Sequence, residues 1–201
     1  MIGHSQTVNL SDSLSHIFSF KPAPTAGYST RNSLISGRNG QVHSVKAGLL
    51  FRKCFSVGLG YNWLGTEFKQ PFDPAVPAFQ GTVKFRYVSV FAEYSFFKKG
   101  PWEASIPLQF GFGNSFLKGP ENSGLQRSHV GCVLLYEPAM KIEYKILNLI
   151  GVGGEVGYRL MLKPNQRIDR AFTSPIYVLN FRIIFEELRK KAKAYQSKSN
   201  E

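Results

Sequence analysis

Hydrophobic and polar residues alternate along residues 102–116. Bulky apolar side chains take most even positions, and Glu, Ser, Gln and Gly take most odd ones. Successive side chains of a strand point to opposite faces, so one face of this segment is apolar and the other is small and polar. A soluble barrel would cover its outside with Lys, Glu and Thr, whereas a polar face of Gly and Ser suits a narrow lumen. The pattern therefore predicts a transmembrane β-strand whose apolar face contacts lipid.

The same alternation recurs along the chain and predicts eight strands. They cover residues 16–28, 41–53, 55–63, 82–97, 102–116, 129–144, 152–160 and 173–185. Long polar connections over residues 29–40, 65–81, 118–127 and 164–171 alternate with short turns near residues 54, 100 and 148. Outer-membrane barrels have an even number of strands, short periplasmic turns and longer extracellular loops. The sequence thus predicts an all-β fold, an eight-stranded antiparallel up-and-down transmembrane β-barrel with both termini in the periplasm.

The segments outside the strands complete the predicted organisation. Residues 1–15 form a flexible periplasmic segment, residues 16–185 the barrel, and residues 186–201 a basic C-terminal tail or short helix. No apolar run approaches the ~20 residues that a membrane-spanning helix needs. The first ten residues lack the apolar core of an export leader, so we expect the sequence of a mature chain.

A soluble lipocalin-like barrel that binds one small ligand is an alternative with the same strand number. It would have to enclose the bulky face of each strand, roughly forty large side chains in all. The interior of an eight-stranded barrel has no such room. Because the interior is too small for these side chains, the membrane barrel is the favoured interpretation.

Three segments carry a resemblance to a known family: residues 57–62 (VGLGYN), residues 151–159 (GVGGEVGYR) and the last strand. They resemble the small outer-membrane barrels of the OmpA/OmpX type, and most of all the Bacteroidota outer-membrane β-barrel proteins. The resemblance implies location in a Gram-negative outer membrane. It also implies an assembly signal in the last strand, although here residues 186–201 continue past it. The signal residues are Tyr177, Leu179, Phe181, Ile183 and Phe185.

The inward positions of the predicted strands hold charges of both signs, which predicts a lumen sealed by ion pairs. If Lys141 lies opposite Glu155, the antiparallel register also places Glu137 opposite Arg159. Glu93 and Glu103 fall opposite each other, so Arg52 or Arg182 should lie between them. The predicted cluster comprises Lys21, Lys46, Arg52, Glu93, Glu103, Glu137, Lys141, Glu143, Glu155, Arg159 and Arg182.

The formal net charge of +12 suggests anionic partners. Lys84 and Arg86 continue the lipid face of their strand above its apolar band, and Arg127 lies in an outer loop. Such cations can bind the phosphates of lipopolysaccharide. We therefore expect membrane lipid, lipopolysaccharide and other outer-membrane proteins as partners, and no nucleic acid.

Aromatic residues gather near both predicted ends of the barrel wall. Trp102, Phe51 and Phe55 lie toward the periplasmic end, and Tyr61 and Trp63 toward the outer end. This distribution predicts the two aromatic girdles of a membrane barrel.

Candidate reactive residues do not form a site. In His43-Ser44 and Ser128-His129, neighbouring side chains of a strand point to opposite faces, so neither pair can share a hydrogen bond. The histidines lack zinc-ligand spacing, and Cys54 and Cys132 fall at opposite ends of the wall, too far apart for a disulfide. The sequence predicts a protein that is not an enzyme and has no cofactor or metal.

Two functions fit this barrel. The first is a structural or accessory subunit of a larger outer-membrane assembly or secretion complex. The alternative is a transporter or channel for small molecules through the lumen. Balanced lumen charges favour the first, and an open lumen of one charge sign would favour the second.

Overall fold

A computed structural model describes residues 21–35, 38–66, 68–73, 76–118, 128–147, 149–162 and 173–185. Its strands are β1 (Ala23–Ile35), β2 (Arg38–Phe51), β3 (Phe55–Leu64), β4 (Phe68–Asp73), β5 (Val76–Lys99), β6 (Trp102–Lys118), β7 (Ser128–Ile146), β8 (Ile150–Met161) and β9 (Ser174–Ile184). Among the described residues, no helix has the length and apolar character needed to cross a membrane.

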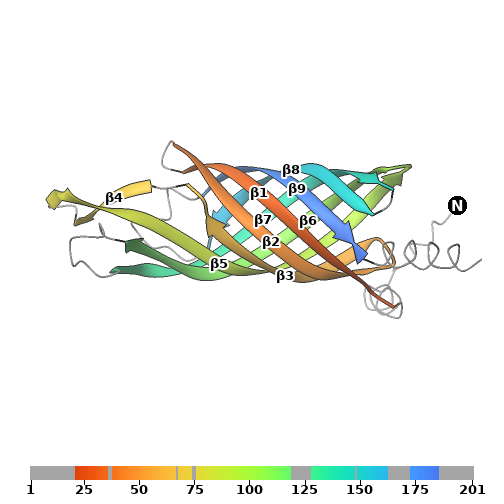
Figure 1. Ribbon diagram of the computed structural model, residues 1–201, viewed down its shortest axis with the longest axis horizontal. Helices are drawn as coiled ribbons and strands as arrows, with labels where there is room; N and C mark the ends of the chain where they lie inside the picture. The colour runs from red at the N-terminus through yellow and green to blue at the C-terminus, as the bar shows by residue number, and fades with distance from the viewer. Residues whose placement is uncertain are drawn as a thin grey trace, which may run out of the picture.

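The strands form one antiparallel sheet that closes on itself (Figure 1). β1 pairs with both β2 and β9, and consecutive strands pair around the ring from β5 to β9. Pairing of β3 with β5 closes the barrel, while β4 pairs only with the first part of β5 and extends beyond the wall. The described strands therefore confirm the predicted eight-stranded up-and-down barrel, with β4 as an addition.

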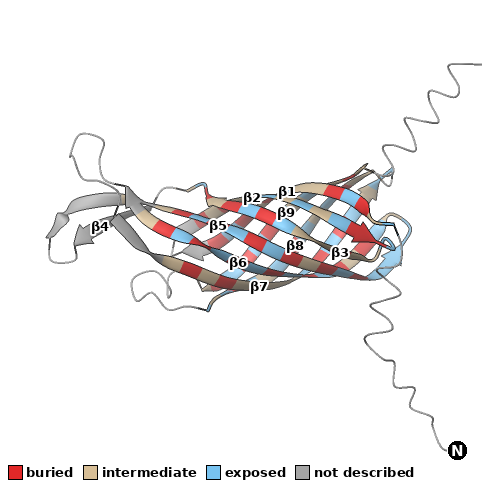
Figure 2. Ribbon diagram, turned by 90° about the horizontal axis from the view of Figure 1, so that it is seen from below, coloured by how far each residue is buried: buried red, intermediate tan, exposed pale blue. Residues whose placement is uncertain are grey.

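Burial alternates along the strands of the barrel wall, as the red and pale-blue stripes in Figure 2 show where burial is described. The outward side chains are large, apolar and exposed: Leu179, for example, is 69% exposed. The inward side chains are polar or charged and buried, with Arg159 at 0%. A soluble barrel would bury its apolar face, so this arrangement contradicts the lipocalin-like alternative. An apolar outer belt over a polar interior is the pattern of a barrel that spans a membrane.

Three short connections lie at one end of the barrel, which we call the turn end, while residues 36–37, which join β1 to β2, form another short connection at the opposite end. Residues 52–54 join β2 to β3, residues 100–101 join β5 to β6, and residues 147–149 join β7 to β8. Gly100 has φ +58°, a conformation that glycine adopts at little cost. β1 starts and β9 ends at this same end, because Thr25 pairs with Ile184 (Figure 1). We call the opposite end the loop end.

The strand boundaries differ from the prediction at the loop end. Residues 29–35 belong to β1 and residues 38–40 to β2, where the sequence predicted a long loop. Residues 68–73 and 76–81 form β4 and the start of β5 inside another predicted loop. In β1 the reason is that Ser29, Arg31 and Ser33 point into the lumen, so their polarity reflects a polar interior. Residues 1–15, 16–20 and 186–201 lie outside the described residues.

Candidate functional site

The interior of the barrel is the most elaborate polar site of the described residues, and the strand registers build it. Lys141 on β7 lies opposite Glu155 on β8, which is one of the registers considered from the sequence, and the same register aligns Glu137 with Arg159. Glycine residues on the inner face leave space for large side chains in the lumen. A Cβ atom on Gly111 of β6 would come within 2.5 Å of the ring of Tyr87, so glycine allows this ring to lie across the lumen.

One group of interior residues surrounds Glu137, and we call it the Glu137 layer. Arg159 donates from Nε to Glu137 Oε1 at 2.5 Å, and Arg31 Nε lies 3.5 Å from Glu137 Oε2. Gln109 donates to the same carboxylate at 3.0 Å. Arg31 also donates to Asn62 at 2.8 Å and to Gln109 at 2.7 Å. This network joins β1, β3, β6, β7 and β8 across the lumen.

A second group lies nearer the turn end, and we call it the Arg182 layer. The guanidinium of Arg182 on β9 donates from Nη2 to Glu143 Oε1 at 2.5 Å. It also lies 3.5 Å from Glu93 and 3.3 Å from Glu103. Lys141 binds Glu93 and lies 3.2 Å from Glu143. Glu93 and Glu143 thus share one guanidinium and one ammonium group, and Glu103 contacts the same guanidinium.

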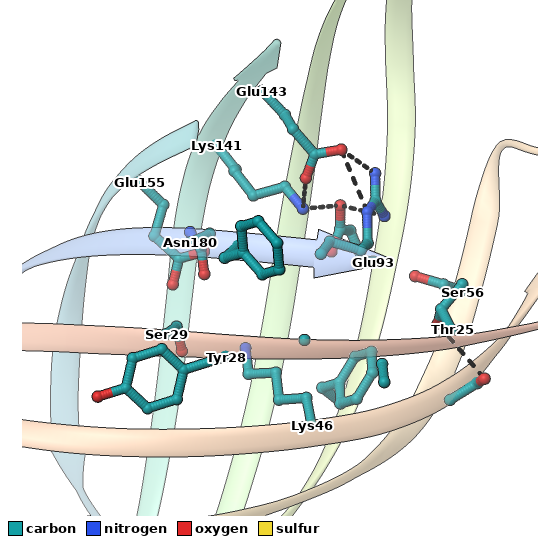
Figure 3. Close-up of a pocket in the computed structure, with 16 residues that line it drawn as sticks. Thr25, Tyr28, Ser29, Lys46, Ser56, Glu93, Lys141, Glu143, Glu155 and Asn180 are labelled. Carbon is teal, nitrogen blue, oxygen red and sulfur yellow. Dashed lines mark hydrogen bonds and ion pairs between the residues drawn. The ribbon is translucent and has the colours of Figure 1, made fainter. Parts of the chain in front are cut away.

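Lys46 and Glu155 lie beside a small cavity that adjoins the Arg182 layer (Figure 3). The cavity has a volume of about 40 Å³. Glu155 accepts a hydrogen bond from Asn180 at 3.0 Å, and the ammonium of Lys46 lies 5.3 Å from the centroid of the Phe91 ring. Lys46 forms no ion pair with a carboxylate of the described residues. A cavity of this size accommodates a few water molecules.

The described interior balances its charges. Apart from Lys98 and Lys145 at the turn end, it holds five cations and five carboxylates: Arg31, Lys46, Lys141, Arg159 and Arg182 with Glu93, Glu103, Glu137, Glu143 and Glu155. At the turn end Lys145 binds Glu103, and Lys98 lies 3.8 Å from the same residue. Opposite charges in contact remove much of the cost of burying either one.

Two predicted members of this cluster are not in the lumen. Lys21 is exposed and precedes the first strand, which begins at Ala23. Arg52 is exposed because it lies in the turn after β2, with φ 47°. Arg31 was predicted to lie in an outer loop, but it is only 1% exposed and belongs to the lumen. The alternation of β1 could have revealed it.

The predicted opposition of Glu93 and Glu103 is also wrong. Glu93 lies opposite Pro107 and Glu103 opposite Lys98, because the short turn between β5 and β6 and a bulge near Ser95 set a different register. Arg182 nevertheless lies between the two glutamates, contacting both as the sequence predicted.

Aromatic side chains gather on the outer wall at two levels. Toward the loop end, His43 lies between Tyr28 and Trp63, with centroid distances of 6.0 and 5.7 Å, and Trp63 stacks on Tyr61. Tyr28 also hydrogen-bonds His43 at 2.7 Å. We call this group the loop-side aromatic cluster.

At the turn end, Trp102 packs edge-on against Tyr144, with ring centroids 5.0 Å apart. Phe55 is partly exposed beside this end. Phe51 was predicted for the same girdle but is only 8% exposed, and the preceding Leu50 is buried as well at the end of β2. It therefore does not belong to the exposed belt.

The other predicted site residues lie on the outer surface or outside the described residues. Arg86 is exposed on the outer face of β5, with its guanidinium 5.2 Å from the centroid of Phe116, and Lys84 is partly exposed on the same face. Arg127 lies outside the described residues. In the last strand Tyr177, Leu179 and Phe181 face outward and are exposed, and Ile183 and Phe185 are partly exposed.

The described residues do not form a reactive constellation. Ser44 is buried in the lumen while its neighbour His43 lies on the outer wall, and Ser44 Oγ has no hydrogen-bond partner among the described residues. No group of three or more His, Cys, Asp or Glu residues in the described part of the chain could hold a metal ion. Cys54, at the turn end, and Cys132, in the loop-end half of β7, are both free thiols.

Comparison with known proteins gives a likeness in structure alone. No protein-family model matches the sequence, and no curated protein matches it. The crystal structure of Neisserial surface protein A matches with a TM-score of 0.56 and 12% identity, over 81% of this chain and 96% of that one. The N-terminal β-barrel domain of Pseudomonas aeruginosa OprF matches with a TM-score of 0.50 and 9% identity, over 81% and 98%. The chain therefore has the fold of the small eight-stranded outer-membrane barrels of the OmpA/OmpX type.

Proposed function

We propose that this chain is an integral outer-membrane barrel with a closed lumen, which serves as a structural or accessory subunit of a larger outer-membrane assembly or secretion complex. The two layers of ion pairs around Glu137 and Arg182 are the observation that supports a closed lumen. Each layer draws side chains from several strands, and together they hold nearly all of the interior charges.

Energetics support a filled interior over a water-filled channel. A buried ion is tolerated when it is paired and hydrogen-bonded, and Glu137 has two guanidinium groups and an amide around it. The cavity of about 40 Å³ beside Lys46 is far smaller than the pockets of roughly 300–1,000 Å³ that hold small ligands. A transporter would need a continuous path past both layers.

We infer the structural role from the outer surface of the barrel, because the interior offers no reactive site among the described residues. The described residues bring together neither a nucleophile with a base nor a set of metal ligands. The outer wall, in contrast, offers a continuous apolar surface to lipid and to neighbouring membrane proteins. We infer a protein without enzymatic activity whose function is carried by contacts of this wall and of its loops.

The orientation in our proposal places the turn end and both termini in the periplasm. Bacterial outer-membrane barrels have short turns on the periplasmic side and longer loops outside. Here three short turns share one end with the start of β1 and the end of β9, and the longer segments 119–127 and 162–173 join strands at the other end, where the β1–β2 connection is also short. The membrane would then be the outer membrane of a Gram-negative cell.

Lipopolysaccharide is the lipid partner that this orientation suggests. Arg86 and Lys84 lie on the outer face of β5 on the loop side of the apolar residues Val88 and Val90. At that level they would meet the phosphates of the outer leaflet, which arginine can bind through two parallel hydrogen bonds. If the double variant Lys84→Ala/Arg86→Ala retained as much lipopolysaccharide as the wild type through purification, this contact would be wrong.

Planar-bilayer recording tests the closed lumen. We expect the purified protein to insert without producing stable conductance. Stable, ion-selective conductance would contradict the proposal and favour the transporter alternative.

The accessory role is tested separately by purification from native membranes in mild detergent, where a reproducible outer-membrane protein complex is expected. Recovery of the barrel alone would contradict that role.

A further inference from the structure

The outer wall carries a groove over β7, β8 and β9. These strands are neighbours in the sheet, as Figure 1 shows. It has a volume of about 480 Å³, which lies within the range of ligand-binding pockets. Ile142, Gly154 and Leu179 form one cross-strand row along it. The next row comprises Met140, Val156, Tyr177 and Asn32.

Gly154 forms the floor of this groove, and the fold does not require a glycine there. A Cβ atom at Gly154 would have no neighbour closer than 3.9 Å. For each of the other glycines tested within the described strands, the added Cβ would lie within 3.0 Å of another atom; at the adjacent Gly153 that distance is 2.3 Å. Those glycines are explained by close packing around the lumen, whereas Gly154 leaves a hollow in the outer wall.

The chemistry of the groove selects an apolar occupant with one polar end. The backbone groups of its strands are engaged in the sheet, and Met140, Ile142, Val156 and Leu179 provide apolar walls. Asn32 is exposed on the outer face, and among the described residues its amide has no hydrogen-bond partner. A protein side chain from a facing strand would fill little of this volume, whereas an acyl chain is long and flexible enough to follow it.

The cross-strand rows show at which leaflet of the membrane Asn32 lies, and with it the polar end of the occupant. One row runs from Trp102 at the turn end through Tyr144, Val152 and Phe181 to Tyr28, which belongs to the loop-side aromatic cluster. Rows therefore rise toward the loop end as they pass from β6 to β1, as expected for tilted strands. Asn32 follows Tyr28 by four residues in the same direction along β1. It thus lies at the loop-side membrane interface, while Gly154 lies deeper.

We propose that this groove binds one acyl chain of lipopolysaccharide, with the Asn32 amide hydrogen-bonding the ester or amide group that links the chain to its headgroup. The proposal rests on the outer-membrane location and orientation given above, because they place lipopolysaccharide in the loop-side leaflet. It does not depend on the closed lumen, so bilayer conductance would leave it standing.

Native mass spectrometry of the full chain in detergent tests the site, with purified lipid A and phosphatidylethanolamine as separate probes. Gly154→Phe fills the hollow without touching the lumen, and Ala47→Phe adds the same ring to an exposed small residue on β2 outside the groove. We expect the wild type and Ala47→Phe to retain one lipid A at low lipid concentration. Gly154→Phe should retain lipid A roughly tenfold less well, because the acyl chain loses its packing contacts in the groove.

Further variants keep the test decisive. If Gly154→Phe does not fold, Gly154→Val fills part of the same space and should weaken retention in the same direction. Asn32→Leu keeps the side-chain size but removes the amide, and it should lower lipid A retention severalfold. Equal retention by all variants would overturn the proposal. So would a preference for phosphatidylethanolamine, or a protein dimer that Gly154→Phe disrupts while lipid A retention is unchanged.

Discussion

Glu137 and Arg159 face each other across β7 and β8, with 2.5 Å between Oε1 and Nε and both side chains buried. The pair is unequal, because Glu137 also faces Arg31 at 3.5 Å, whereas Arg159 has no other carboxylate partner among the described residues. Nη1 and Nη2 of Arg159 form no hydrogen bond in the described structure. The carboxylate is therefore the centre of the layer, and the two guanidinium groups depend on it.

This inequality predicts unequal costs of substitution. Glu137→Gln leaves two buried guanidinium groups without a carboxylate, and it should lower the free energy of unfolding by about 3–5 kcal/mol. Arg159→Gln leaves Glu137 paired with Arg31 and should cost less. The measurement is urea unfolding of the barrel in lipid vesicles. Lys98→Ala, which removes a partly exposed partner of Glu103, is the control and should change stability by about 1 kcal/mol or less. Equal costs for the two lumen variants would contradict the inequality.

The two layers also predict how the lumen opens. Arg31→Ala removes one cation from the Glu137 layer, and Arg182→Ala removes the shared cation of the Arg182 layer. Because either layer alone still fills the lumen, each single variant should remain non-conducting in planar bilayers. The double variant should conduct, and it should favour cations because the remaining carboxylates outnumber the remaining interior cations. Conductance from either single variant would show that one layer alone closes the barrel.

Two sequence signals were used to predict this structure: the alternation of side chains along the strands and the polarity of the segments between them. The alternation of side chains determines faces, so the fold class and most interior charges could be predicted, whereas the alignment of Lys141 with Glu155 was only one of the registers that this pattern allows. Strand ends were predicted from polarity, and this signal fails in a barrel whose interior is itself polar. Arg31 was therefore assigned to a loop, although it is a central interior residue.

Errors in the other direction have a similar cause. Lys21 and Arg52 continue the inward phase of their strands, but the strands do not include them. Ion-pair partners were also beyond prediction, because they depend on reach across the lumen and not on register alone. Lys141 lies opposite Glu155 but binds Glu93 and Glu143, which belong to β5 and to its own strand.

A charge on the outer wall should be costly if the belt contacts lipid. Val90 is exposed on the outer face of β5, and Val90→Arg places a cation in the belt. We expect the free energy of folding into vesicles to become less favourable by about 2–4 kcal/mol, the cost of arginine near the bilayer midplane. Val90→Leu, which keeps the position apolar, is the matched control and should change little. Equal folding of the arginine variant and the control would contradict membrane contact at this strand.

Gly153 and Gly154 are adjacent on β8 but should respond in opposite ways to the same substitution. An added Cβ at Gly153 would lie 2.3 Å from the carbonyl oxygen of Ile142 and 2.8 Å from the Cα atom of Glu143, so the wall must shift. Gly153→Ala should therefore lower the free energy of unfolding by about 1–3 kcal/mol. At Gly154 the nearest atom is 3.9 Å away, and alanine also loses less backbone entropy on folding than glycine.

We expect Gly154→Ala to be neutral or to stabilise the barrel by up to about 1 kcal/mol. Both variants can be compared by urea unfolding in the same vesicles, with the unfolding slope as a check that each remains a cooperative barrel. A loss of stability at Gly154 as large as that at Gly153 would mean that the fold itself needs this glycine. In that case the hollow in the outer wall would be a consequence of packing, and its assignment as a lipid site would lose its main support.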